Sequence, residues 1–201
     1  MKVKIWGTRG SIPTPLKPVE VRAKVREAIL NLPEGIDPHN AEAVDAYLET
    51  LSPLSTGTAG GNTTCVEIQA GKNILIIDAG SGLRELGQEL MRGPCGRGEG
   101  ILYFFFTHAH WDHIQGFPFF APAFIPGNQI FIYSIHNIHK VLDEQQNFIN
   151  FPVSLSSMQA KLTFLPVEPQ KPFQVDDITI NTIETAHPGK AYAYRFEAEQ
   201  G

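Results

Sequence analysis

Cysteine is scarce in this sequence, and long apolar runs are absent. Cys65 and Cys95 are the only two cysteines, and their spacing fits neither a zinc ribbon nor a redox-active pair. No apolar run approaches the ~20 residues that a helix needs to cross a bilayer. The N-terminus lacks the apolar region of a signal peptide. We therefore expect a cytoplasmic protein with reduced thiols and no membrane association.

An excess of positive charge is also lacking. The formal net charge is -5, which gives no electrostatic case for broad nucleic-acid binding, although a local basic patch is still compatible with it. The hydrophobic content of 42% and charged content of 18% are typical of a soluble globular protein. A length of 201 residues suits one domain with its own core. We predict one domain over residues 1–201.

The glycine-rich stretch at residues 57–62 (GTAGGN) does not match a phosphate-binding loop, because it lacks the Gly-Lys-Ser/Thr ending of that motif. A different chemistry stands out further along the chain. Residues 107–113 read THAHWDH and place His108, His110, Asp112 and His113 directly after an apolar stretch, residues 101–106 (ILYFFF). That stretch is typical of a buried strand. Neutral imidazoles and carboxylates are the ligands that zinc and similar divalent ions prefer. The pattern therefore predicts a metal site at the end of this strand.

Most of the remaining sequence predicts strands with interspersed helices. Val3 and Ile5 mark a first strand, and Ser81 is a suitable N-cap for a helix with Leu83, Leu86 and Leu90 on its inner face. A second helix is expected over residues 136–148. The further predicted strands are residues 64–70, 73–78, 101–106, 129–135, 161–167, 178–185 and 191–197.

A helical insertion separates the first two strands. Val21, Val25, Ile29 and Leu32 recur at helical spacing, and a second apolar stripe follows in residues 44–51. We predict a helical hairpin at about residues 16–55. It is either additional scaffold or a lid or wall of a substrate cleft.

The histidine run resembles the metal-binding signature of the metallo-β-lactamase superfamily. Residues 76–80 (IIDAG), with Asp78, and residues 186–189 (AHPG), with His187, resemble two further motifs of that superfamily. Residues 7–13 (GTRGSIP) and 60–65 (GGNTTC) are similar to a phosphodiesterase-like branch near ribonuclease Z. The resemblance covers most of the chain.

This resemblance implies an α+β fold, an αββα sandwich of two mixed sheets with outer helices and metals at one edge. It implies two divalent ions, zinc first, with manganese or iron as alternatives. His108, His110 and His187 would hold one ion, and Asp112 and His113 the other. Asp112 is also the candidate catalytic residue. Asp78 would orient the histidine loop from outside the ligand sphere; alternatively, it is a carboxylate at a helix N-terminus.

The sequence departs from this family after His187. The family has a bridging aspartate and a last histidine further on, whereas here no histidine follows His187 and the remaining acids are Glu197 and Glu199. We therefore expect the chain to represent about two thirds of the fold. Exposed sheet edges would then allow a homodimer.

The ligand set predicts a hydrolase that uses a metal-activated hydroxide. By resemblance, a phosphodiester such as a cyclic nucleotide or an RNA is the expected substrate, and thioesters or lactones are the alternative. A non-catalytic metal-binding or sensor domain is the competing hypothesis. Asn62, Thr63 and Arg9 are candidate contacts to substrate oxygens, because they lie in glycine-rich loops.

Overall fold

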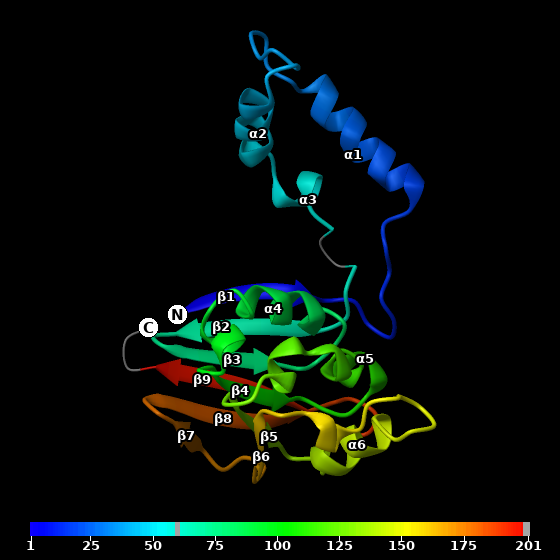
Figure 1. Cartoon of the computed structure of the whole chain (residues 1–201). Helices are drawn as coiled ribbons and strands as arrows, with labels where there is room; N and C mark the ends of the chain where they lie inside the picture. The colour runs from blue at the N-terminus through cyan, green and yellow to red at the C-terminus, as the bar shows by residue number, and fades with distance from the viewer. Residues whose placement is uncertain (59–60, 199–201) are drawn as a thin grey trace.

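Two β-sheets pack face to face, and helices cover the outer face of the larger one (Figure 1). The computed structural model describes residues 1–58 and 61–198. The strands are β1 (Lys2–Gly7), β2 (Cys65–Ala70), β3 (Asn73–Ile77), β4 (Ile101–Phe106), β5 (Gln129–Ser134), β6 (Lys161–Pro166), β7 (Phe173–Val175), β8 (Ile178–Thr185) and β9 (Ala191–Ala198). The α-helices are α1 (Pro18–Leu30), α2 (Ala41–Thr50), α3 (Pro53–Thr56), α4 (Leu83–Leu90), α5 (Trp111–Ile114) and α6 (Ile138–Gln145). Short 3-10 helices are η1 (Pro94–Arg97), η2 (Phe117–Phe119), η3 (Ala121–Phe124) and η4 (Leu155–Ser157).

The larger sheet is mixed and has the strand order β1-β2-β3-β4-β5-β6. The pairs β1–β2 and β2–β3 are antiparallel, whereas β3, β4, β5 and β6 run parallel. Parallel strands end at the same edge of a sheet, and α/β proteins bind ligands beyond the carboxyl ends of such strands. This topology places the residue after β3, Asp78, beside the histidine run after β4.

The smaller sheet has the order β7-β8-β9 and is antiparallel in both of its pairings. The predicted α+β sandwich is therefore confirmed, but the expectation of two mixed sheets is correct only for the larger one within the described residues. Short turns join β7 to β8 and β8 to β9, and a short turn can join only antiparallel neighbours.

Strand β4 supplies the centre of two apolar layers. Phe104 and Phe106 face the outer layer with Leu86 of α4, and Phe105 faces the inner layer between the sheets, where it packs against Tyr194 of β9. All three phenylalanines are almost completely buried, and each such burial contributes roughly 1.5–3 kcal/mol. The strand that carries the histidine run is thus held firmly on both faces.

The inner face of the larger sheet extends past the smaller sheet. Val3 and Ile5 of β1 pair with Ile68 and Val66 of β2, both of which belong to or border the inner apolar layer. Nevertheless, Val3 is 58% and Ile5 is 62% exposed. The β1 end of the sandwich therefore presents an uncovered apolar surface.

Helices α1, α2 and α3 form an arm that stands away from the sandwich (Figure 1). Within the arm, the Tyr47 hydroxyl donates to the Ala28 carbonyl, and Lys24 donates to the carbonyls of Leu54 and Gly57. The helices lie where an insertion at about residues 16–55 is expected, and the domain boundaries stay a prediction. Across residues 1–58 and 61–198, no helix has the length and apolarity needed to span a membrane.

Candidate metal centre

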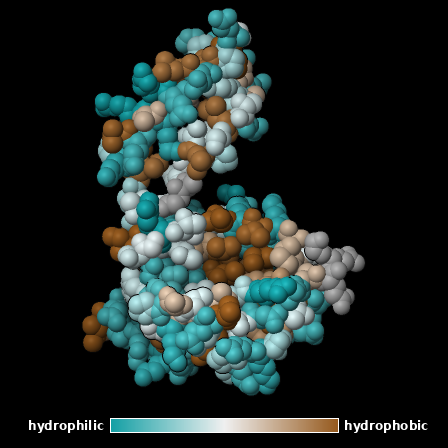
Figure 2. All heavy atoms as spheres, turned by 180° about the vertical axis from the view of Figure 1, so that it is seen from behind, coloured by the Kyte–Doolittle hydropathy of each residue, from teal (hydrophilic) through white to brown (hydrophobic). Residues whose placement is uncertain are grey.

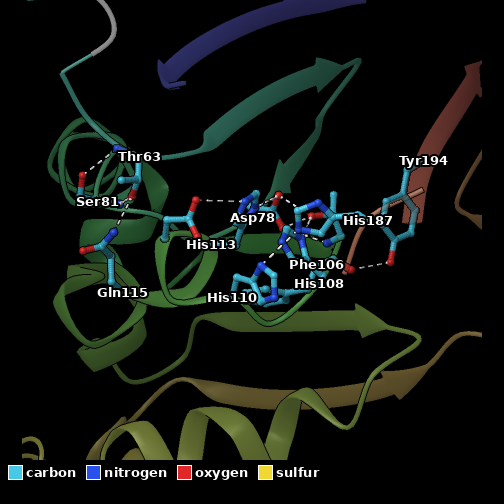
Figure 3. Close-up of polar contacts among 12 residues, drawn as sticks. Thr63, Asp78, Ser81, Phe106, His108, His110, His113, Gln115, His187 and Tyr194 are labelled. Carbon is cyan, nitrogen blue, oxygen red and sulfur yellow. Dashed lines mark hydrogen bonds and ion pairs between the residues drawn. The ribbon is translucent and has the colours of Figure 1, made fainter. Parts of the chain in front are cut away.

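The histidine run leaves β4 at the carboxyl edge of the parallel strands. His108 is buried, with 6% of its surface exposed, whereas His110 is exposed. Asp78 follows β3 at the same edge and has a φ of 60°. This left-handed conformation costs a non-glycine residue of order 1–3 kcal/mol, and aspartate tolerates it better than most residues do. The bend turns the Asp78 carboxylate toward the histidine loop (Figure 3).

Asp78 accepts hydrogen bonds from three donors of that loop. The Thr107 amide donates to Oδ1 at 2.8 Å, the Thr107 hydroxyl lies 2.8 Å from Oδ2, and His113 Nδ1 lies 2.7 Å from Oδ2. Asp78 is 1% exposed, so water does not substitute for these donors. One buried carboxylate therefore fixes both ends of the histidine run.

This network assigns the ring nitrogens of two histidines. The Thr107 hydroxyl gives its proton to Asp78, so it must accept from His108 Nδ1, which lies 3.0 Å away. His113 likewise donates from Nδ1 to Asp78. In a neutral imidazole the other nitrogen then carries the lone pair. Nε2 of both His108 and His113 is therefore available as a ligand atom.

The β8–β9 hairpin brings His187 to the same place from 74 residues beyond His113. Its turn is closed by a hydrogen bond from the Lys190 amide to the His187 carbonyl. Two further bonds fasten the hairpin to the end of β4. The Tyr192 amide donates to the Thr107 carbonyl at 3.0 Å, and the Tyr194 hydroxyl donates to the Phe106 carbonyl at 2.9 Å.

The imidazoles of His108, His110 and His187 converge (Figure 3). One potential ligand atom from each of the three lies within 4.8 Å of the others, and His187 Nε2 is 3.2 Å from His110 Nδ1. Three imidazole nitrogens from two separate segments are a donor set that suits zinc and related ions. The residues present therefore fit a divalent metal. The structure brings together the three rings that the resemblance groups, and their role as ligands of one ion stays a prediction.

Asp112 and His113 lie on the neighbouring side of His108. His113 Nε2 is 3.5 Å from Asp112 Oδ2, and the His108 and His113 ring centres are 4.1 Å apart. The Ser11 amide donates to Asp112 Oδ2 at 2.9 Å. The resemblance assigns this pair to a second ion, and that role stays a prediction.

Burial and hydrogen bonding act in opposite directions on these groups. Burial disfavours the Asp112 carboxylate, but the Ser11 amide and the nearby His113 outweigh it and lower the pKa of Asp112. Burial also disfavours the His113 imidazolium, but the Asp78 hydrogen bond and charge raise the pKa of His113. For Asp78 itself burial dominates and raises the pKa. Asp112 is thus the more readily ionised of the two carboxylates.

His108 gives a pH prediction for the metal-free protein. Burial, followed by the neighbouring histidines, lowers the pKa of His108 from 6.5 to about 4. Between these two pH values the unfolded chain binds more protons than the folded chain. The contribution of His108 to the free energy of unfolding is therefore fully present above pH 6.5 and is lost as the pH falls toward about 4.

In urea unfolding with a chelator, the difference in unfolding free energy between wild type and His108→Gln should shrink by up to about 2 kcal/mol from about pH 7 to about pH 5. A difference that is constant with pH would show that His108 titrates alike in both states.

Two of the three predicted substrate contacts, Asn62 and Thr63, form hydrogen bonds within the protein. The prediction for Thr63 is wrong, because Thr63 is fully buried and its hydroxyl accepts from the Ser81 amide and from Gln115. Asn62 is partly buried, and its Oδ1 accepts from the Ser81 hydroxyl. Arg9 is exposed and stays a prediction. Gly60 of the same glycine-rich stretch and Glu199 of the chain end lie outside the described residues.

The role predicted for Ser81 is also corrected. Helix α4 begins after Gly82, its N-cap, and the Ser81 side chain instead accepts a hydrogen bond from the Thr63 amide (Figure 3). The Ser81 hydroxyl also donates to Asn62 Oδ1. Sequence reasoning missed Ser11 and Tyr194 as partners of the site. Ser11 lies in the GTRGSIP motif, which was a usable signal, whereas no local pattern around Tyr194 announces its bond to β4.

Comparison with known families places the chain. The sequence profile described as "Beta-lactamase superfamily domain" matches residues 72–201. The chain belongs to this superfamily. The match contains β3 to β9 with Asp78, the histidine run and His187. No curated protein sequence matches the chain.

Solved structures of the superfamily fold are similar over much of the chain. A diphosphatase from the PhnP family is 18% identical, with a TM-score of 0.57 over 96% of this chain and 61% of that one. Human tRNase Z, short form, is 14% identical, with a TM-score of 0.51 over 99% of this chain and 66% of that one. The metallo-β-lactamase fold protein YhfI from Bacillus subtilis is 22% identical, with a TM-score of 0.48 over 68% and 51%. The chain thus spans 51% to 66% of these structures.

Proposed function

We propose that this protein is a metal-dependent hydrolase and that a phosphodiester is its substrate. The proposal rests on one observation above all, the convergence of His108, His110 and His187 from two segments of the fold. Membership of the beta-lactamase superfamily supports it. A diphosphatase and a tRNase among the similar structures make phosphodiesters the first substrates to test.

The three histidines would hold one divalent ion, with zinc first and manganese or iron as alternatives, and Asp112 with His113 would hold a second. A bound divalent ion acts as a Lewis acid and lowers the pKa of water. The contribution of the protein is to hold the ligand side chains in their binding orientation before a metal ion arrives. Asp78 and Thr107 hold His108 with Nε2 directed away from Thr107, and Asp78 does the same for His113.

Asp112 is the proposed catalytic carboxylate. The Ser11 amide holds its Oδ2, and the lowered pKa keeps it ionised near neutral pH. In that state it can serve as a ligand or accept a hydrogen bond from water that attacks the substrate. The cytoplasmic location and the small-molecule or nucleotide substrate remain predictions of the same proposal.

A substrate panel tests the proposal. After loading with zinc or manganese, the wild-type chain should hydrolyse bis(p-nitrophenyl) phosphate at least about tenfold faster, in kcat/KM, than a thioester or a lactone, a difference of about 1.4 kcal/mol in transition-state binding. Chelation should abolish the activity.

Two other outcomes would redirect this assignment. A metal-loaded protein that prefers thioesters or lactones would keep the hydrolase and change its substrate. A protein that binds one ion per chain and turns over none of the panel would be the non-catalytic metal-binding domain.

A further inference from the structure

The arm formed by α1, α2 and α3 lacks a core of its own. The three helices have 13, 10 and 4 residues, and isolated helices shorter than about 12–15 residues are marginal in water. All residues of these helices are described, and Tyr47 is the one buried side chain among them. The arm also stands apart from the sandwich (Figure 1). Helices of this kind need a further packing surface.

Helix α1 has an apolar stripe that faces solvent. Val21, Val25 and Ile29 follow one another at intervals of four residues, which places them on one side of the helix. They are 46%, 53% and 67% exposed. The side that contacts the rest of the arm borders this stripe next to Val21 and carries Lys24 and Ala28, which leaves Val25 and Ile29 facing away from it. Figure 2 shows apolar side chains on the surface of the arm.

Charges on the two helices are opposite and equally spaced. Arg22 and Arg26 flank the apolar stripe of α1, one turn apart, and Asp45 and Glu49 lie one turn apart on α2 beside the exposed Leu48. Four residues advance a helix by about 6 Å, so the two basic charges on α1 have the same spacing along the helix axis as the two acidic charges on α2. Within the described residues, no ion pair involves any of these four side chains.

We propose that the arm is a dimerisation element and that its partner is the arm of a second copy of this chain. In a two-fold arrangement, α1 of each copy packs on α2 of the other and covers the stripe of Val21, Val25 and Ile29. Arg22 and Arg26 of one copy then face Asp45 and Glu49 of the other, and this occurs twice by symmetry. Two arms without cores become one four-helix cluster with a shared apolar centre.

Self-complementarity favours a second copy over other occupants. The apolar stripe and basic pair on α1, and the matching acidic pair on α2, belong to the same arm, so two identical arms satisfy both surfaces at once. The uncovered inner face near Val3 and Ile5 is the competing surface for association. That surface lies on the sandwich and not on the arm, so mutations in α1 and α2 distinguish the two interfaces.

Light scattering coupled to size exclusion, with the 201-residue chain at a low and a high micromolar concentration, tests the proposal. Wild type should be dimeric at the higher concentration. Ile29→Glu should raise the dimer dissociation constant at least about tenfold, because it places a charge in the apolar centre. Leu30→Glu is the matched control. Leu30 is 64% exposed, against 67% for Ile29, but lies about 100° further around the helix, so its replacement should leave the dimer intact.

A charge exchange gives the second test. Arg22→Glu with Arg26→Glu should dissociate the dimer, because four acidic pairs would then face each other. Adding Asp45→Arg and Glu49→Arg to the same chain should restore it. A wild-type monomer at both concentrations would overturn the proposal. So would a dimer that survives Ile29→Glu, equal disruption by Leu30→Glu, or a failure of the exchanged charges to restore association.

Discussion

We expect that replacing either His110 or His187 with alanine removes the proposed zinc binding and the proposed hydrolysis together. Both side chains are exposed, so the fold should not change, but each supplies one of three converging nitrogens. Loss of an outer-shell partner already costs about 10–100-fold in metal affinity, and loss of a ligand should cost more than about 100-fold. Isothermal titration with zinc and turnover of bis(p-nitrophenyl) phosphate measure the two effects.

The double variant tests whether the two rings act on one ion. If they do, His110→Ala/His187→Ala should be scarcely worse than either single variant in turnover, because residues that act as a unit are strongly non-additive. His39→Ala is the control, since His39 is an exposed histidine in the arm, outside the cluster. Independent, additive losses, or full zinc affinity in His187→Ala, would contradict a shared site.

The sequence is most informative where the chemistry is local. His108, His110, Asp112 and His113 lie within six residues after a strongly apolar strand, so their proximity follows from chain connectivity alone. His187 is different, because its approach depends on the β8–β9 hairpin docking on β4 through Tyr192 and Tyr194. Only the family resemblance, not periodicity, linked it to the cluster.

Errors arose where burial decided the role of a polar residue. Thr63 and Ser81 look like loop residues that are free to contact a ligand or cap a helix, but they bond to each other over 18 residues. Such a partnership satisfies buried donors and acceptors and leaves no local pattern. Short β7, with three residues, was missed for a similar reason, because its identity as a strand comes from pairing with β8.

Most of the long elements could be read from alternation and helical spacing. The strands predicted at residues 129–135 and 161–167 are observed as β5 and β6, within one residue at each end. The helix expected at residues 136–148 is shorter, since α6 begins after Asn137, whose side chain accepts from the Lys140 amide. A cap of this kind competes with extension of the helix toward His136.

Asp78→Asn will lower both stability and metal affinity, because Asp78 is the shared acceptor of the histidine loop. Asparagine keeps the volume and tolerates the left-handed backbone at φ 60°, so the change isolates the carboxylate chemistry. One oxygen becomes an amide that faces the Thr107 and His113 donors. The unfolding free energy should fall by about 1.5–3 kcal/mol, and zinc affinity should fall about 10–100-fold.

Urea unfolding without metal and zinc titration separate these two effects of Asp78→Asn. Asp177→Asn, a change at an exposed aspartate on the β7–β8 turn, is the control and should alter neither quantity. If Asp78 acts only as a structural anchor, stability will fall while the zinc affinity of the folded fraction stays at the wild-type value. If Asp78 also fixes Nδ1–H on His113 and, through Thr107, on His108, both quantities will fall, because each ring can then turn its proton toward the metal.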